Sequence, residues 1–178
     1  MKNLIKRLTL FILLTLFIAS CSGRGPVGPE GPPGEPGPEI LPTSFEFNAT
    51  LMPSNGYEFF QSIPDQIDII DSDVMLAFIL EDYIPEDDLE VWRKLPITEF
   101  NSRGTLLIDY DFTLIDIRIF LDANYNLNIT DGLEDVLIRA VHIPSNFVGK
   151  TKGNQSLEQI ETYQELQVFL GMNIVKIN

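Results

Sequence analysis

The chain has 178 residues, a formal net charge of −14 at pH 7, one cysteine and one histidine. Such a negative charge repels nucleic-acid phosphates and anionic lipid, so it disfavours nucleic-acid binding. A single cysteine excludes an internal disulfide framework, and the length suits one ordinary domain.

The first 20 residues have the pattern of an export signal. Lys2, Lys6 and Arg7 precede an apolar run over residues 8–18. This run is too short to span a bilayer, because a spanning helix needs about 20 apolar residues. We therefore predict a cleaved signal peptide over residues 1–20. Its removal takes away three basic and no acidic residues, which changes the formal charge from −14 to −17.

The residues around Cys21 resemble a lipobox. The sequence Ile-Ala-Ser-Cys ends at Cys21 and is similar to the lipobox of bacterial lipoproteins. The resemblance implies that the Cys21 thiol is acylated, the chain is cut before it and its new amino group is acylated. Two or three acyl chains anchor a protein stably, whereas one binds marginally. An ordinary secretory signal with an incidental cysteine is the alternative.

Ser22 bears on localisation. The sorting rule of Gram-negative lipoproteins retains a protein in the inner membrane when Asp follows the cysteine. Ser22 therefore implies the outer membrane by resemblance. The choice between the periplasmic and the cell-surface face stays open.

A Gly-X-Y tract follows, with glycine at positions 25, 28, 31, 34 and 37. Glycine at every third position is the period of collagen, in which three polyproline II chains crowd one axis. Because the tract is short, two interpretations stay open: a homotrimer through residues 25–39, or a stiff spacer of about 3.1 Å per residue. We divide the remaining chain into a lipidated, collagen-like stalk, residues 21–39, and an acidic globular domain, residues 40–178.

The chain also resembles a known family. A lipobox cysteine followed by GPVGPEGPPGEPG is similar to the small collagen-like lipoproteins of the Bacteroidota. Later stretches resemble the same family, namely LLIDYDF at 106–112, DIRIFLDANYN at 116–126 and RAVHIPS at 139–145. The resemblance implies a lipid-anchored envelope protein and brings no catalytic motif with it.

Alternating apolar residues predict strands in the first half of the domain. Residues 45–51 alternate, and the turn-forming residues 53–56 follow, so we predict a hairpin with residues 57–63. Asn55 or Gly56 would take the positive φ. Residues 74–80 are apolar on both faces, which predicts a central strand covered on both sides.

The second half continues this pattern. A second hairpin is predicted between residues 89–96 and 104–112, turning at 101–104, with Leu106, Ile108, Tyr110 and Phe112 facing inward. Residues 115–121 and 136–143 predict two further strands; in the first, Phe120 breaks the polar face. Thr162, Glu165 and Gly171 suit the two caps of a short helix. Residues 174–177 would close the sheet.

These elements predict a mainly β fold. We expect an antiparallel two-sheet β-sandwich, Ig-like or Greek-key, with one short C-terminal helix, and an open α+β sheet as the alternative. The corresponding function is a non-catalytic outer-membrane or cell-surface lipoprotein, whose sandwich has a structural, adhesive or binding role toward an unspecified protein or glycan.

Catalytic motifs are sparse. The sequence has no G-x-S-x-G elbow, no H-E-x-x-H and no Walker loop. His142 alternates with Ile138 and Ala140, which favours a packed sheet histidine over a catalytic or metal-binding one. The domain has many acidic residues, and glycoside hydrolysis needs two carboxylates, so a small envelope hydrolase is the alternative function.

Calcium is the one cofactor that the sequence suggests. Alternating oxygen-bearing side chains follow a predicted strand: Asp122, Asn124, Asn126 and Asn128, with Asp131 beyond them. An EF-hand loop would have glycine in place of Leu127 and glutamate in place of Leu133. Because Asn and Asp also favour turns, a plain loop is the alternative to a calcium-stabilised module.

Aromatic residues offer a further possibility of glycan or peptide recognition. The candidates are Tyr57, Phe60, Tyr83, Trp92 and Tyr125. Sandwich cores contain aromatic residues in any case, so only an exposed apolar patch would support this hypothesis.

Overall fold

The computed structural model describes residues 41–147, 156–171 and 174–177. The chain clusters into two units, residues 1–38 and 39–178, and all described residues belong to the second. The predicted signal peptide, the lipidation of Cys21, Ser22 and the Gly-X-Y tract therefore lie outside the described residues. Within the described ranges, no helix is long and apolar enough to cross a membrane.

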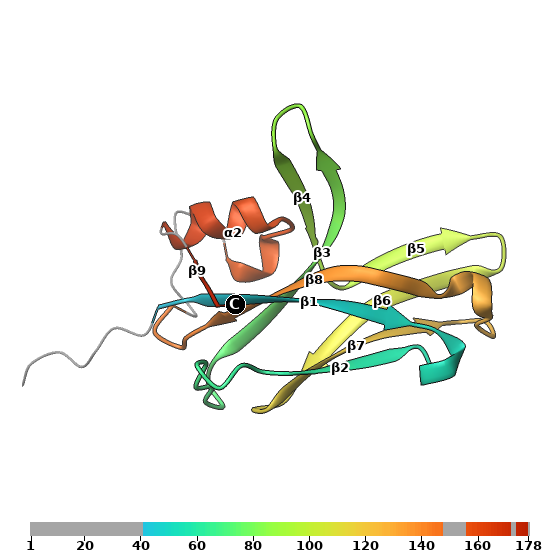
Figure 1. Cartoon of the computed structure of the whole chain (residues 1–178), viewed down its shortest axis with the longest axis horizontal. Helices are drawn as coiled ribbons and strands as arrows, with labels where there is room; N and C mark the ends of the chain where they lie inside the picture. The colour runs from blue at the N-terminus through green and yellow to red at the C-terminus, as the bar shows by residue number, and fades with distance from the viewer. Residues whose placement is uncertain (1–40, 148–155, 172–173, 178) are drawn as a thin grey trace, which may run out of the picture. The chain divides into compact units, whose positions relative to one another are not determined.

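The domain is a sandwich of two β-sheets (Figure 1). One sheet has five strands in the order β4-β3-β8-β1-β9, and the other has four in the order β2-β7-β6-β5. Among the described strands, all pairs are antiparallel except β1 with β9. The mainly β, two-sheet fold with one short helix is thus confirmed.

The elements follow one another in chain order. They are β1 (Thr43–Leu51), η1 (Pro53–Asn55), β2 (Glu58–Ser62), β3 (Val74–Ile84), β4 (Leu89–Lys94), β5 (Ile97–Asn101), β6 (Gly104–Phe112), β7 (Asp116–Ala123), η2 (Ile129–Asp131), β8 (Leu133–Ile143), η3 (Leu157–Gln159), α2 (Tyr163–Leu170) and β9 (Val175–Lys176).

The main core lies between the two sheets. Every second residue of β1 faces inward, and Phe47 stacks on Phe59 of β2 with ring centroids 6.1 Å apart. Ile117 and Ile119 of β7 and Ile138 of β8 are completely buried in this core. Each such side chain stabilises the fold by about 1.5–3 kcal/mol relative to an exposed position.

A second core lies on the outer face of the five-stranded sheet. Helix α2 packs Leu166 and Phe169 against Phe78 and Val141 of that sheet. Residues 74–80 of β3 therefore face apolar surroundings on both sides, as predicted.

The caps of α2 also agree with the sequence. Thr162 Oγ1 accepts a hydrogen bond from the Glu165 N–H at 3.2 Å, and the Glu165 carboxylate accepts one from the Thr162 N–H at 3.3 Å. Gly171 ends the helix in the left-handed conformation, with φ of 68°. The predicted capping box and C-terminal glycine are confirmed.

The first predicted hairpin is wrong. β1 pairs with β8, and β2 pairs with β7 of the other sheet, so residues 52–57 carry the chain between sheets. Gly56 and Tyr57, at φ of 69° and 62°, make this turn. The physical reason is burial, because the apolar faces of β1 and β2 enter the same core from opposite sides.

The second predicted hairpin has the wrong first strand. Residues 89–94 form β4, which pairs with β3, and the strand that turns into β6 is β5. Pro96 separates the two because it cannot donate a ladder hydrogen bond. Leu106 and Ile108 face inward as predicted, but Phe112 at the end of β6 is exposed. Ile115 precedes β7 and is also exposed.

Candidate functional site

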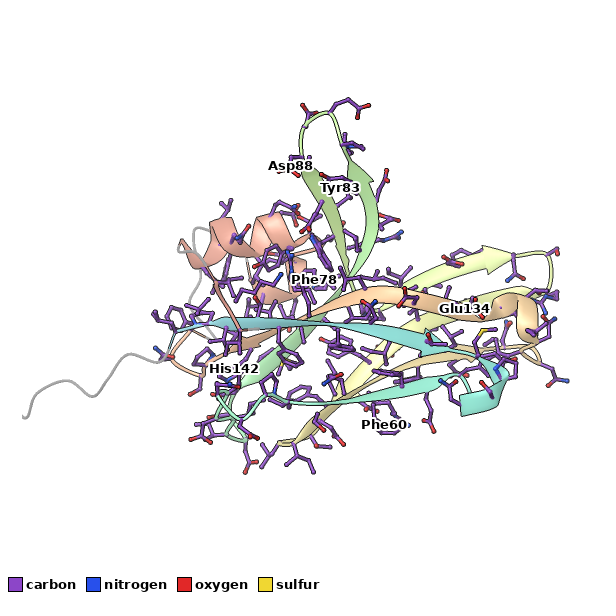
Figure 2. The ribbon with its side chains drawn as sticks, in the orientation of Figure 1. Phe60, Phe78, Tyr83, Asp88, Glu134 and His142 are labelled. Atoms are coloured by element: carbon purple, nitrogen blue, oxygen red, sulfur yellow. The ribbon has the colours of Figure 1, made fainter. Side chains whose placement is uncertain are left out.

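The two sheets differ in what covers their outer faces. Helix α2 buries part of the outer face of the five-stranded sheet, whereas the outer face of the four-stranded sheet keeps side chains exposed or half-buried in the described residues. Phe60 of β2 points away from the facing sheet (Figure 2) and is 56% exposed, and Phe100 of β5 is 82% exposed. We call this surface the open face. Its central residues are Glu58, Phe60, Thr98, Phe100, Leu107, Asp109, Asp111, Arg118, Phe120 and Asp122.

Strand register interleaves rings with charges on the open face. Phe60 lies opposite Arg118, and Phe120 lies between Glu58 on one side and Asp109 on the other. Directly opposed residues on one face of a sheet have Cβ atoms about 5 Å apart, so these groups touch. The open face is therefore neither a plain apolar patch nor a plain acidic one.

Arg118 occupies the centre of this arrangement. Its Nη1 donates to Glu58 at 3.2 Å and its Nε to Asp111 at 3.1 Å, and Nη2 donates to Asp111 as well. The guanidinium carbon lies 4.7 Å from the ring centroid of Phe120 and 6.0 Å from that of Phe60. The hydrogen bonds to Asp111 raise the pKa of Arg118 above its usual value, so the residue stays charged.

The open face carries an excess of negative charge. Strands β2, β5, β6 and β7 contain six acidic residues, and Arg118 is their one basic residue; five of the six lie on the open face, whereas Glu99, opposite the buried Leu106, lies on the other face. Exposed rings supply flat apolar contact, and carboxylates accept hydrogen bonds or pair with cations. The surface suits a ligand that combines apolar groups with positive charge or with hydrogen-bond donors.

The predicted aromatic residues separate into three environments. Phe60 and Tyr83 are exposed, Trp92 is buried and Tyr57 and Tyr125 are half-buried. Tyr83 lies on the β3–β4 hairpin, which projects from the sandwich, and its hydroxyl donates to Asp88 at 2.7 Å (Figure 2). Phe100 was not among the predicted residues, although its position directly before the turn at 101–104 was a usable signal.

His142 is a packed sheet histidine, as predicted. It is 2% exposed, and its Nε2 lies 2.8 Å from Asp73 Oδ2. Asp73 also accepts the N–H groups of Ser145 at 2.8 Å and Ile70 at 3.2 Å. Burial raises the pKa of the Asp73 carboxyl, but the hydrogen bonds from His142 and these N–H groups lower it by more. The net pKa of Asp73 therefore lies below its usual value. The pair ties the segment before β3 to the end of β8.

The predicted calcium ligands have other partners. Asn124 Oδ1 accepts the Thr105 N–H at 2.9 Å, and Asn128 Oδ1 accepts the Thr130 N–H at 2.8 Å. Asp122 bonds the adjacent Ala123 N–H at 2.8 Å, and Asn126 is exposed.

Asp131 is the buried member of this set. It accepts hydrogen bonds from the Asn128 N–H, the Tyr125 hydroxyl and Arg103. Burial raises the pKa of its carboxyl, but these donors lower it to a net value below normal. The described residues contain no group of three His, Cys, Asp or Glu that could hold a metal ion. Calcium binding stays a prediction, and the described residues of this loop make turn and capping hydrogen bonds.

A groove beside β4 gathers several carboxylates. Its volume is about 540 Å³, and Glu81, Glu158 and Glu161 line it together with Arg93 and Lys94. Glu81 pairs with Arg93 at 3.1 Å, and Lys94 donates to the Glu158 carbonyl at 3.3 Å. Glu81 thus has an ion-pair partner in the groove, whereas Lys94 contacts a backbone carbonyl and lies in the field of Glu158 and Glu161.

Comparison with protein-family models, with curated proteins and with solved structures finds no match for this chain. The resemblance to collagen-like lipoproteins therefore stays a prediction from the sequence.

Proposed function

We propose that the chain is a lipid-anchored envelope protein whose β-sandwich is a non-catalytic binding module, with the open face as its binding surface. The lipobox-like sequence ending at Cys21 supports the anchor, and Ser22 supports the outer membrane. The observation that carries the binding role is the open face itself. Its exposed Phe60 and Phe100 lie among carboxylates on the sheet face that α2 leaves bare.

The stalk and the charge support the same function. As a spacer, residues 25–39 would hold the domain about 45 Å from the lipid at about 3.1 Å per residue. The formal charge, which changes from −14 to −17 on removal of the signal peptide, repels anionic head groups. The domain would then be kept off the bilayer and stay accessible to partners in the envelope.

Site-specific crosslinking in cells tests this proposal. A photoreactive phenylalanine analogue replaces Phe60 in one variant and Val168 in the other. Val168 lies on α2 and is 75% exposed, so it controls for exposure alone. We expect a discrete crosslinked product from position 60 and none from position 168. Equal crosslinking at both positions, or none at position 60, would contradict the binding role.

A separate arm tests the anchor. Cells that express the chain are labelled with radioactive palmitate, beside cells that express Cys21→Ala. We expect label and membrane fractionation for the unaltered chain and neither for the variant. An unlabelled chain would refute the anchor and leave the crosslinking result interpretable.

A further inference from the structure

Strand β5 offers a free backbone edge. The edge of β4 is covered at its C-terminal end, since the Lys94 N–H donates to the Glu161 carbonyl at 2.8 Å and Arg93 forms a β-bridge with Thr162. The other edge strand of the five-stranded sheet, β9, is only two residues long. The other edge strand of the four-stranded sheet, β2, lies beside β1 of the facing sheet. β5 has five residues, and all but Ile97 are exposed. In the described part of the chain, β5 is thus an exposed edge at which a strand can be added.

The backbone groups of Phe100 point to this edge. Phe100 lies opposite Thr105. The backbone groups of Thr105 point away from β5, toward Asn124 after β7. The Thr105 C=O accepts the Asn124 N–H at 3.2 Å, and the Thr105 N–H donates to Asn124 Oδ1 at 2.9 Å. The two residues thus form a non-hydrogen-bonded pair, and the Phe100 N–H and C=O face outward. Because backbone groups alternate in direction along a strand, the N–H and C=O of Thr98, two residues away, also point to the free edge.

The side chains at this edge are apolar and are flanked by acidic groups. Phe100 is 82% exposed, and Leu107 lies two pairs farther along the hairpin, opposite Thr98 and on the same face. Leu107 also pairs with Asp122 of β7, and Asp109 is the next residue of β6 on the same face. A strand laid along β5 would set alternate side chains beside Phe100, on the sheet face that carries Asp109.

We propose that β5 binds an extended, basic segment of a partner protein by β-strand addition. Backbone hydrogen bonds to Thr98 and Phe100 supply affinity, and long lysine or arginine side chains of the segment extend over β5 toward Asp109 of β6. Charge selects this occupant, since six acidic residues and one basic residue stand in the four strands. A second copy of this chain would instead bring like charges together. The inference rests on the proposed binding function and specifies its partner.

A synthetic peptide tests the inference with the full chain purified in detergent. The probe is a fluorescent heptapeptide in which lysine alternates with valine, and its binding is followed by anisotropy. We expect saturable binding that weakens with added salt, and none for the peptide with glutamate in place of lysine. Hydrogen exchange should slow at the N–H groups of Thr98 and Phe100. A lysine peptide that does not bind would overturn the inference.

Backbone pairing is tested by blocking it on either side. The same peptide with N-methyl groups on alternate residues cannot donate along one edge, and we expect at least a tenfold loss of affinity for the unaltered chain. Thr98→Pro removes a donor that points to the free edge and should weaken binding similarly without loss of a sheet hydrogen bond. Phe100→Ser should weaken binding, and the matched control Val168→Ser should not.

The outcomes separate this inference from the proposed function. If Phe60→Ser weakens peptide binding while N-methylation and Thr98→Pro do not, the open face binds through side chains alone. That result overturns strand addition and leaves the binding role standing. Because the N-methylated peptide is used with the unaltered chain, the test holds even if Thr98→Pro fails to fold.

Discussion

Two arginines make the same kinds of contact on the outer faces of the two sheets, in opposite surroundings. Arg139 of β8 lies on the covered face and Arg118 of β7 on the open face. Arg139 donates to Glu46 at 2.7 Å and to Glu90 at 2.9 Å, and its guanidinium carbon lies 3.9 Å from the Trp92 centroid and 4.4 Å from that of Tyr163. Each arginine therefore has two carboxylate partners and two aromatic neighbours.

Burial is what separates the two clusters. The side chain of Arg139 is 10% exposed, and that of Arg118 is 35% exposed. Tyr163, at the start of α2, closes over Arg139, while nothing in the described residues closes over Arg118. The Arg139 cluster thus holds α2 against the five-stranded sheet, whereas the similar Arg118 cluster stays accessible to a ligand on the four-stranded sheet.

The largest predicted effect is that of Arg139→Ala. We expect a loss of about 3 kcal/mol in the free energy of unfolding, because Glu46 and Glu90 would lose a largely buried partner, although Lys176 still pairs with Glu46. Arg118→Ala is the matched control and should unfold close to the unaltered chain, since exposed ion pairs contribute little. Urea unfolding followed by the fluorescence of Trp92, the sole tryptophan, measures both. Equal losses would show that burial does not distinguish the two faces.

A smaller effect is expected from Thr162→Ala. The substitution removes the N-terminal cap of α2 and should cost about 1 kcal/mol. Loosening of α2 should also admit water to Trp92 and shift its emission to longer wavelength. Val168→Ala, at an exposed position of the same helix, is the control and should change neither quantity. An unshifted emission spectrum in Thr162→Ala would mean that the cap does not hold α2 on the sheet.

The smallest effect concerns Glu46 and pH. Burial raises the pKa of Glu46, but Lys176 and Arg139 lower it, and the net pKa lies below the ordinary 4.5. A carboxyl with a lowered folded pKa adds stability above about pH 4.5, and this stability is lost as pH falls through the folded pKa. The melting temperature of Glu46→Gln should therefore lie below that of the unaltered chain at pH 7, with a smaller difference at pH 3.

Asp111→Asn on the open face is the control for this pH dependence. Asp111 is exposed, so its replacement should change the melting temperature little at either pH. A Glu46→Gln difference that is as large at pH 3 as at pH 7 would contradict the assignment of the ion pair to the covered face.

Strands were easier to predict than their partners. Alternation located β6, β7 and β8 within a few residues, because one buried face imposes a period of two on a strand. Alternation does not indicate which strand pairs with which, and both predicted hairpins had a wrong strand partner. β1 pairs with β8 across about 90 residues, and no local signal specifies such a contact.

The open face could be predicted only in part. Phe60 was a candidate and is exposed, whereas Trp92 was a candidate and is covered by Arg139 and α2. Both are aromatic residues in strands, so composition and periodicity treat them alike. The position of Phe100 before the predicted turn was a local signal, but its place on an edge strand came from the strand pairing.

By itself, the sequence determined local conformation and periodicity: strands with alternating faces, the capped helix α2 and a β3 that is apolar on both sides. Capping, turn chemistry and side-chain period act between residues that are neighbours in the chain, so they can be read from its order. The tertiary structure alone decided which sheet α2 covers and which edge stays free. Those outcomes depend on how distant apolar faces share one interior, and the open face is the surface left over when that interior is complete.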